Sequence, residues 1–233
     1  MSKSPCSDLK NGRHLQVALD LLDKGLALKI AEASGRLGAK IVEAGTPLIK
    51  MYGAEVIREI KEAAGGACVL ADMKAADVGR VEVSMASKFG ADIVTVLGCS
   101  SDETISEALE EAKKNNVLLE VDLINLKNPI KRLESLKKLG VEAFSFHIPI
   151  DVQKKKKKGA ESLIRSLKTL RGEGLLISAA GGLNPERIKM FRDVPVNVFV
   201  VGGFITGSEN FEERIKEVLK AIDELNNLNA GQS

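Results

Sequence analysis

Short apolar runs alternate with longer amphipathic stretches along the chain. The runs are six to eight residues long and rich in Val, Ile and Leu, which is typical of strands in a parallel sheet covered by helices. They lie at 15–20, 40–45, 67–74, 93–98, 117–124, 143–149, 175–181 and 197–203. The pattern therefore predicts eight strands.

The stretches between these runs carry apolar residues at helical spacing. They predict helices over 23–37, 51–64, 101–115, 129–139, 162–171, 184–192 and 211–225. Asn184 has the character of an N-cap because Pro185 and Glu186 follow it. Gly140 follows the fourth of these helices, where a left-handed cap is favoured.

Strands that alternate with helices in this way are typical of a (β/α)₈ TIM barrel. No linker-like stretch interrupts the series, so we expect a single domain over 15–228, with a polar N-terminal arm at 1–14 and a C-terminal tail at 229–233. A doubly wound open sheet is the alternative. It would usually carry GxGxxG after its first strand, whereas Asp20 is followed by LLDKG.

Composition narrows the class of partner. The 233 residues carry a formal net charge of only +2, and aromatic residues make up 3%. A general nucleic-acid binder would be more basic, and a base-stacking surface needs aromatic rings. No apolar run approaches the roughly 18 residues of a membrane span, and the N-terminal stretch, with an exposed His14, lacks the apolar core of a signal peptide. We expect a cytoplasmic protein that binds neither nucleic acid nor membrane.

The three cysteines, Cys6, Cys68 and Cys99, form no CxxC pair. Their number and spacing predict neither a zinc site nor a disulfide framework. Cys68 and Cys99 lie in or beside apolar runs, which favours buried reduced thiols.

Ionisable residues gather where the predicted strands end, which is where the active sites of such barrels lie. These residues are Asp20, Glu43, Asp72, Lys74, Asp77, Asp122 and His147. Asp72 and Lys74 are two residues apart, so their side chains share one face of a strand. The group either transfers protons and stabilises negative charge or forms a salt-bridge network that closes the barrel. His147 is either a proton shuttle or a structural histidine.

Paired glycines end the seventh and eighth strands, namely Gly181, Gly182, Gly202 and Gly203. The loops after these strands commonly bind phosphate in such barrels, so the pairs indicate either a phosphate site or simple tight turns. Glu43 and Asp72 end neighbouring strands, and paired carboxylates of this kind suit Mg²⁺, although their spacing alone does not establish a metal site.

Several motifs resemble the orotidine 5′-monophosphate decarboxylase superfamily. They are LQVALD, VEAGTPLIK, ADMKAADVG, ADIVTVLG, VDLI and the two GG strand ends, which occur in the same order over residues 15–222. VEAGTPLIK together with ADMKxxD is similar to the branch that contains the 3-hexulose-6-phosphate synthases and the 3-keto-L-gulonate-6-phosphate decarboxylases. VTVLG and VDLI look more like the synthases.

The resemblance implies an Mg²⁺-dependent aldol lyase that interconverts D-ribulose 5-phosphate plus formaldehyde and D-arabino-3-hexulose 6-phosphate through an enediolate. It also implies a homodimer. The implied roles are metal binding by Glu43 and Asp72, proton transfer and positioning by Lys74 and Asp77, with Asp77 in a partner's site, and acid–base catalysis by His147. Asp20 and Thr46 would bind substrate hydroxyls, and Gly181, Gly182, Gly202 and Gly203 would bind its phosphate.

The chain departs from the family pattern after His147. Pro149 stands where the synthases usually have Gly, and Ile150 stands where the decarboxylases usually have Arg. A run of five lysines, Lys154–Lys158, follows as either a cationic rim that attracts phosphates or a solvated face. The absence of Arg at position 150 argues against a decarboxylase, which stays as an alternative because it would share the metal and the enediolate. Pro149 and the lysine run favour the other alternative, a non-catalytic sugar-phosphate-binding barrel.

Overall fold

Eight parallel strands close into one barrel in the computed structural model, which describes residues 6, 8–156, 160–170 and 174–230. Each strand pairs with the next along the chain, and the last pairs with the first. The strands are β1 His14–Leu19, β2 Ile41–Ala44, β3 Cys68–Ala75, β4 Ile93–Leu97, β5 Leu118–Asp122, β6 Ala143–His147, β7 Leu176–Ala180 and β8 Val198–Val201. The predicted TIM barrel is therefore confirmed, and each of the eight predicted runs overlaps one strand.

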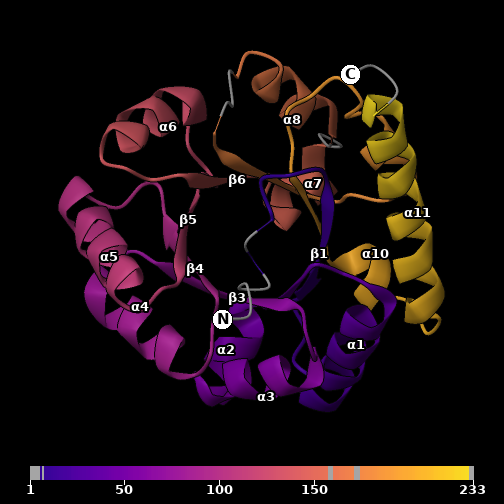
Figure 1. Cartoon of the computed structure of the whole chain (residues 1–233), viewed down its shortest axis with the longest axis horizontal. Helices are drawn as coiled ribbons and strands as arrows, with labels where there is room; N and C mark the ends of the chain where they lie inside the picture. The colour runs from indigo at the N-terminus through magenta and orange to yellow at the C-terminus, as the bar shows by residue number, and fades with distance from the viewer. Residues whose placement is uncertain (1–5, 7, 157–159, 171–173, 231–233) are drawn as a thin grey trace.

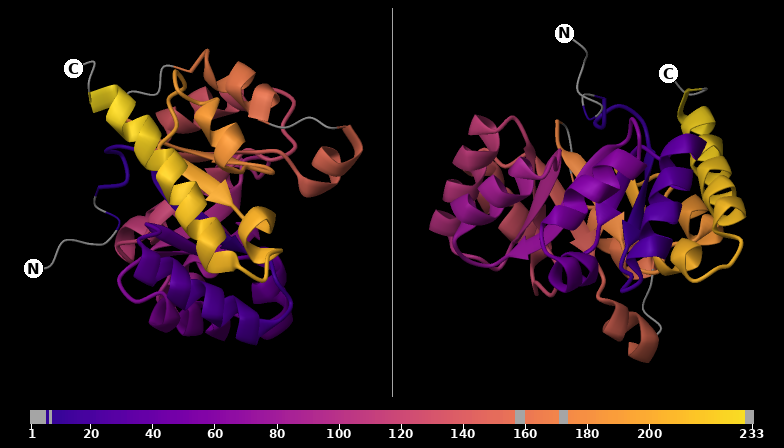
Figure 2. Two further views of the ribbon diagram at one scale, coloured as in Figure 1. Left: turned by 90° about the vertical axis from the view of Figure 1, so that its right-hand side faces the viewer. Right: turned by 90° about the horizontal axis from the view of Figure 1, so that it is seen from below.

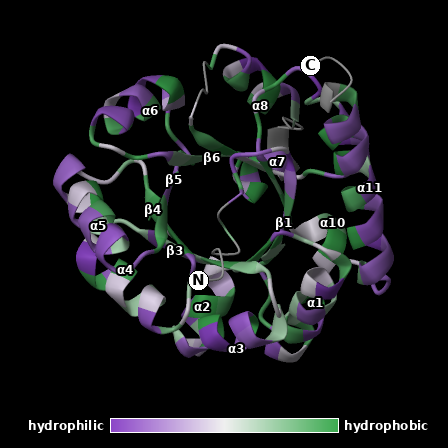
Figure 3. Ribbon diagram, in the orientation of Figure 1, coloured by the Kyte–Doolittle hydropathy of each residue, from purple (hydrophilic) through white to green (hydrophobic). Residues whose placement is uncertain are grey.

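Helices surround this ring, with their apolar faces against the strands and their polar faces outward (Figures 1 and 3). They are α1 Lys24–Leu37, α2 Thr46–Tyr52, α3 Glu55–Ala63, α4 Gly79–Lys88, α5 Asp102–Lys114, α6 Pro129–Lys138, α7 Ile150–Lys156, α8 Ala160–Leu167, α9 Pro185–Lys189, α10 Gly203–Thr206 and α11 Phe211–Ala230. The main core lies between the sheet and these helices and includes Val42, Val94 and Phe144.

Local signals explain several helix boundaries. The Asn184 side chain accepts a hydrogen bond from the Arg187 amide, as an N-cap does, and Gly140 adopts a left-handed φ of 93°. The helix predicted over 51–64 was wrong in extent, because Gly53, with φ 76°, separates α2 from α3. The sequence patterns also missed α4 and the short helices α7 and α10.

The N-terminal arm closes the bottom of the barrel, where the strands begin. Leu9 is 2% exposed and packs with Ile41, Ile93 and Leu176 inside the ring, and the indigo segment crosses the opening in Figure 1. His14, expected to be exposed, is half-buried in β1, and its Nε2 lies 2.9 Å from the Asn11 carbonyl. The arm therefore acts as a plug rather than as a free tail.

Two expectations for the cysteines were wrong. Cys6 in the arm forms a disulfide with Cys68 at the start of β3, and Cys99 is exposed. The 62 residues between Cys6 and Cys68 give no local signal of this pairing. The arm brings the two cysteines together when it folds under the barrel.

The opposite end of the barrel carries the loops that follow the strands. The short helix α7 projects beyond this end in both views of Figure 2, whereas α11 ends at the plugged side. The lysine run begins within α7, but the side chains of 154–156 and all of residues 157–159 lie outside what the structure describes. No helix in the described ranges is long and apolar enough to cross a membrane.

Candidate active site

A cavity of about 800 Å³ opens at the end of the barrel where the strands terminate. Every predicted site residue except Asp77 lines it: Asp20, Glu43, Thr46, Asp72, Lys74, His147, Gly181, Gly182, Gly202 and Gly203. The strand ends thus bring together residues that are up to 183 positions apart in the chain.

Lys74 lies at the centre of the charged groups. Its Nζ donates a hydrogen bond to Asp72 Oδ2 and lies 3.4 Å from Asp122 Oδ2. Burial acts to lower the pKa of Lys74, but Asp72 and Asp122 outweigh it and raise the pKa above its ordinary value. Lys74 is therefore a fixed positive charge at neutral pH, held between two carboxylates.

The backbone of β3 is distorted where it presents Lys74. The residue has a φ of 46°, which is uncommon outside glycine, and the β3–β4 register shifts between Ala71 and Ala75. The Lys74 amide donates to Thr95 Oγ1 at 2.9 Å. Such outliers concentrate at functional sites because the surrounding structure must stabilise them.

Two threonines fix the Asp72 carboxylate. Thr46 Oγ1 lies 2.8 Å from Oδ2 and 2.7 Å from the Asp72 carbonyl, and Thr95 Oγ1 donates to Oδ1 at 2.8 Å. Asp72 is 4% exposed. With these partners and Lys74, its orientation is set before any substrate binds.

His147 and Asp122 form the second pair beside Lys74. His147 Nδ1 lies 3.2 Å from Asp122 Oδ2. Burial acts to raise the pKa of Asp122, but the hydrogen bond and charge of His147 and the charge of Lys74 lower it overall. Asp122 Oδ2 accepts from Nδ1–H and so holds the imidazole in an orientation that leaves Nε2 as the ring nitrogen available for proton exchange in the cavity.

Three carboxylates gather at the opposite side of Lys74. Asp20, Glu43 and Asp72 each offer an oxygen within 4.8 Å of the others. Burial raises the pKa of Glu43 well above its ordinary value, and the charges of Asp72 and Asp20 raise it further. Asp20 is exposed at the edge of the cavity, where partial desolvation and the charge of Asp72 raise its pKa. A hard divalent cation would relieve this repulsion, so the residues fit Mg²⁺.

The glycine pairs form the rim after β7 and β8. Gly181 has a φ of 132° and Gly182 a φ of 62°, so a side chain at either position would strain the turn. Arg187 Nη1 donates to the Gly182 carbonyl, which brings a positive charge to this rim. Pro149, the departure from the family pattern, also lines the cavity.

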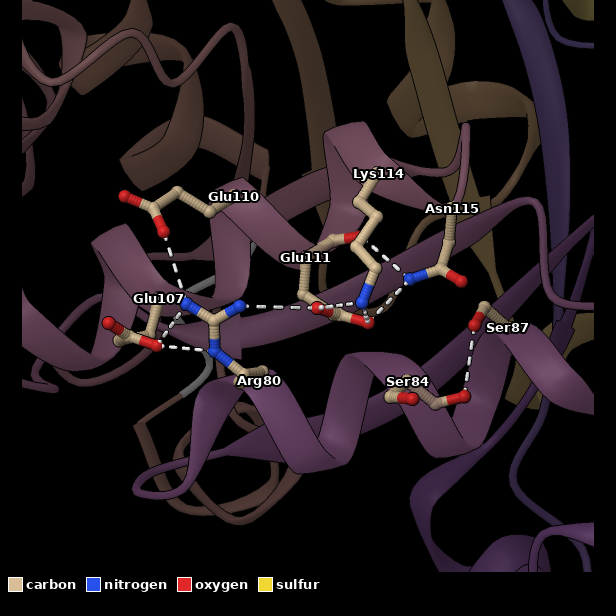
Figure 4. Close-up of polar contacts among 8 residues, drawn as sticks. All are labelled: Arg80, Ser84, Ser87, Glu107, Glu110, Glu111, Lys114 and Asn115. Atoms are coloured by element: carbon tan, nitrogen blue, oxygen red, sulfur yellow. Dashed lines mark hydrogen bonds and ion pairs between the residues drawn. The ribbon is translucent and has the colours of Figure 1, made fainter.

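Asp77 lies outside the cavity of its own chain. It is exposed, and its Oδ1 accepts a hydrogen bond from the Val78 amide immediately before α4. Arg80, one turn further on, pairs with Glu107, Glu110 and Glu111 of α5 (Figure 4). This network fixes the start of α4 and therefore the loop that carries Asp77.

Sequence reasoning gave no role to several residues that the structure places here. The sequence predicts Asp122 as a strand-end acid without a function and assigns none to Thr95, Gln16 and Glu120. Glu120 is two residues before Asp122, so the twofold period of a strand was a signal that both side chains point into the barrel.

Comparison with known proteins agrees with this architecture. Residues 13–218 match the family described as orotidine 5′-phosphate decarboxylase / HUMPS. A 3-hexulose-6-phosphate synthase of Staphylococcus aureus (strain MSSA476) is 36% identical over 211 residues, which cover 90% of this chain and 98% of the relative. A solved 3-hexulose-6-phosphate synthase structure superimposes with a TM-score of 0.84 and 36% identity, over 89% of this chain and 99% of that one.

Longer relatives also match. A bifunctional enzyme Fae/Hps of Methanoculleus marisnigri is 33% identical over 209 residues, which are 90% of this chain but 52% of the relative. The chain thus spans about half the length of these bifunctional relatives. Because the family match covers nearly the whole barrel, the chain belongs to the orotidine 5′-phosphate decarboxylase / HUMPS family.

Proposed function

We propose that the chain is a carbon–carbon lyase of the 3-hexulose-6-phosphate synthase type. It would join formaldehyde to D-ribulose 5-phosphate, reversibly, to give D-arabino-3-hexulose 6-phosphate. The observation that carries the proposal is the pairing of the fixed Lys74 cation with the Asp122–His147 pair beside three carboxylates in one cavity. The full-length similarity to the Staphylococcus aureus synthase supports it.

In the proposed reaction, His147 Nε2 removes a proton from C1 of ribulose 5-phosphate. The electron pair of the broken C–H bond forms the enediolate, and Lys74 stabilises its negative charge. C1 then attacks the carbonyl carbon of formaldehyde. A new carbon–carbon bond forms, and the former formaldehyde oxygen takes the proton back from His147. Asp122 holds the imidazole in the tautomer that this cycle needs.

Glu43, Asp72 and Asp20 would hold Mg²⁺ in the proposed enzyme. When bound, the ion supplies a Lewis acid that stabilises negative charge on the substrate oxygens. Thr46 would hold Asp72 in place, and both Thr46 and Asp20 lie where they could reach substrate hydroxyls. The backbone N–H groups of the two glycine pairs, with Arg187 beside them, would bind the phosphate.

The assembly proposed here is a homodimer in the cytoplasm, where phosphorylated sugars are made. Asp77 would then reach into the partner's cavity, because it does not line its own. Val78 and Val81 support this arrangement, since they are 56% and 60% exposed beside Asp77. An interface that covers them would remove this apolar surface from water.

The test is formaldehyde consumption with ribulose 5-phosphate, with and without added Mg²⁺ and a chelator. We expect turnover that chelation abolishes and that Mg²⁺ restores. Absence of turnover, or turnover that is indifferent to chelation, would overturn the proposal. Release of CO₂ from 3-keto-L-gulonate 6-phosphate without formaldehyde chemistry would instead assign the decarboxylase reaction, while tight sugar-phosphate binding with neither reaction would indicate a binding protein.

A further inference from the structure

A buried carboxyl inside the barrel has no role in the reaction described above. Glu120, in the middle of β5, is 2% exposed, and Ser178 Oγ of β7 donates to its Oε2 at 2.9 Å. Among the ion pairs of the described residues, the nearby cation Lys74 pairs with Asp72 and Asp122 rather than with Glu120. Glu120 therefore lies in the barrel with a hydroxyl as its partner and no cation of its own.

A small cavity of about 30 Å³ lies in the barrel interior next to this carboxyl. Glu120, Gln16 and Glu43 are among its lining residues. Gln16 Nε2 donates to Glu43 Oε2 at 2.7 Å, whereas Gln16 Oε1 is buried and has no hydrogen-bond partner in the described structure. A polar cavity of this size holds one water molecule when two or more polar groups bind it.

Glu120 and Gln16 Oε1 can bind the same water molecule, because the protonated carboxyl is a hydrogen-bond donor and Oε1 is an acceptor. A buried carboxylate without a cation is costly, so the neutral acid is favoured, and burial raises the pKa of Glu120 to about 7 even though the Ser178 hydrogen bond opposes this. A neutral carboxylic acid carries a proton to donate, and Gln16 Oε1 is an acceptor without a donor. The other titratable groups that line the same cavity are Glu43 of β2, Asp72 and Lys74 of β3, Asp122 of β5 and His147 of β6.

We propose that Glu120 is a positioning residue that holds one buried water against Gln16 Oε1. This water fixes the orientation of the Gln16 amide, so that Nε2 rather than Oε1 faces Glu43. A flipped amide would place its carbonyl oxygen against the Glu43 carboxylate, and the two acceptors would repel each other. Glu120 thus acts on Glu43 through the water and Gln16, without contact with substrate.

The first test measures thermal stability and needs no knowledge of the reaction. A carboxyl whose native pKa is raised costs stability as pH rises from its unfolded value towards its native value. We therefore expect the Tm of Glu120→Gln to rise relative to wild type by roughly 5 °C between pH 5.5 and pH 8.5. The exposed Glu134→Gln serves as the control, with no such relative rise. Parallel Tm profiles for wild type and Glu120→Gln would overturn the neutral-acid assignment.

The second test asks whether the water is present and whether it matters. A high-resolution crystal structure should show one water between Gln16 and Glu120, and an empty cavity would overturn the proposal. Glu120→Leu, which can hold no water, should lower kcat at least tenfold with a much smaller change in KM for ribulose 5-phosphate, while Glu120→Gln should stay within about threefold of wild type. Unchanged kcat in Glu120→Leu would overturn the positioning role.

This kinetic readout rests on the proposed function. If the wild-type chain catalyses neither candidate reaction, Mg²⁺ affinity measured by titration calorimetry takes its place, and Glu120→Leu should weaken it at least tenfold. If Glu120→Leu fails to fold, the Tm comparison with Glu120→Gln still decides the neutral-acid assignment, and the crystal structure of the wild type still decides whether the water is present. Failure of the proposed function thus leaves the Tm profiles and the buried water as independent tests.

Discussion

At the bottom of the barrel, Ile41, Ile93 and Leu176 fill the interior with apolar side chains, whereas farther along the same strands Glu43, Thr95 and Ser178 point inward. The interior positions follow the twofold period of each strand, so the polar side chain lies two positions after the apolar one, with a single residue between them. β3 shows the whole gradient, from Leu70 to Asp72 to Lys74. The same strands thus form an apolar bottom, where they begin, and a polar mouth, where they end and the cavity lies.

The two ends are also closed differently. Leu9 and the Cys6–Cys68 disulfide seal the bottom with the N-terminal arm. The mouth keeps a cavity of about 800 Å³, and its charges are held by hydrogen bonds among themselves. Substitutions at the bottom should therefore change stability, and substitutions at the mouth should change activity.

The largest effect on activity is expected for Lys74→Ala. It removes the cation between Asp72 and Asp122, so we expect kcat/KM for the formaldehyde reaction to fall roughly 10³-fold. Lys137→Ala, on the exposed face of α6, is the matched control and should retain wild-type activity. If kcat/KM of Lys74→Ala falls by less than tenfold, the reaction does not depend on the charge of Lys74.

Ile93→Ala should lower stability and leave activity nearly unchanged. Ile93 is fully buried in the bottom cluster, so truncation should lower the free energy of unfolding by about 2–5 kcal/mol, measured by urea denaturation. Its kcat at 25 °C should remain within about twofold of wild type, because the cluster lies below the cavity. Leu139→Ala, at a partly exposed position, is the control for stability. A large loss of kcat in folded Ile93→Ala would show that the two ends are coupled.

The affinity for Mg²⁺ should depend on pH through Glu43. Burial and the neighbouring Asp72 and Asp20 raise its pKa, and a proton on Glu43 competes with the metal. We expect affinity to fall by about tenfold per pH unit below that raised pKa, with proton release on binding, by titration calorimetry. Glu43→Gln should bind Mg²⁺ weakly and lose most of the pH dependence. A wild-type affinity that does not change with pH would contradict metal binding by Glu43.

The smallest effect is expected for Arg80→Ala on the outer surface. Arg80 makes three ion pairs, but its side chain is solvent-exposed, and the buried Glu111 keeps Lys114 and Asn115 as partners when Arg80 is removed. The Tm should change by less than about 2 °C. A larger loss would show that the contact between α4 and α5 in Figure 4 does more than fix the Asp77 loop.

The sequence patterns predicted the residues at the mouth of the barrel well, but not the contacts that close its bottom. Strand runs and strand-end charges were sufficient to place Asp20, Glu43, Asp72, Lys74 and His147 in one cavity. That inference worked because parallel strands all end on one side of the barrel. The helix α4 was missed because its sequence, GRVEVSMASK, has five polar or charged residues among β-branched and small ones and only a weak apolar face.

The remaining differences depend on contacts between distant residues. Nothing in the local sequence indicates that Cys6 meets Cys68 or that Leu9 enters the barrel, because the arm acquires these partners only when it folds under the ring. Gln16 and Glu120 lie inside apolar runs, so the pattern of each run predicts a strand but no polar site. Asp77 was placed at the site through its motif, whereas in one chain it lies outside the cavity, and its role depends on the proposed dimer.

The measurement that tests the proposed chemistry most directly is proton exchange at C1 of ribulose 5-phosphate. The substrate is incubated with the enzyme and Mg²⁺ in D₂O without formaldehyde, and the C1 signals are followed by NMR. If His147 removes this proton, deuterium should enter one C1 position with wild-type enzyme and at least 10²-fold more slowly with His147→Ala. Formaldehyde turnover by wild type without any C1 exchange, or equal exchange by His147→Ala, would contradict the proposal.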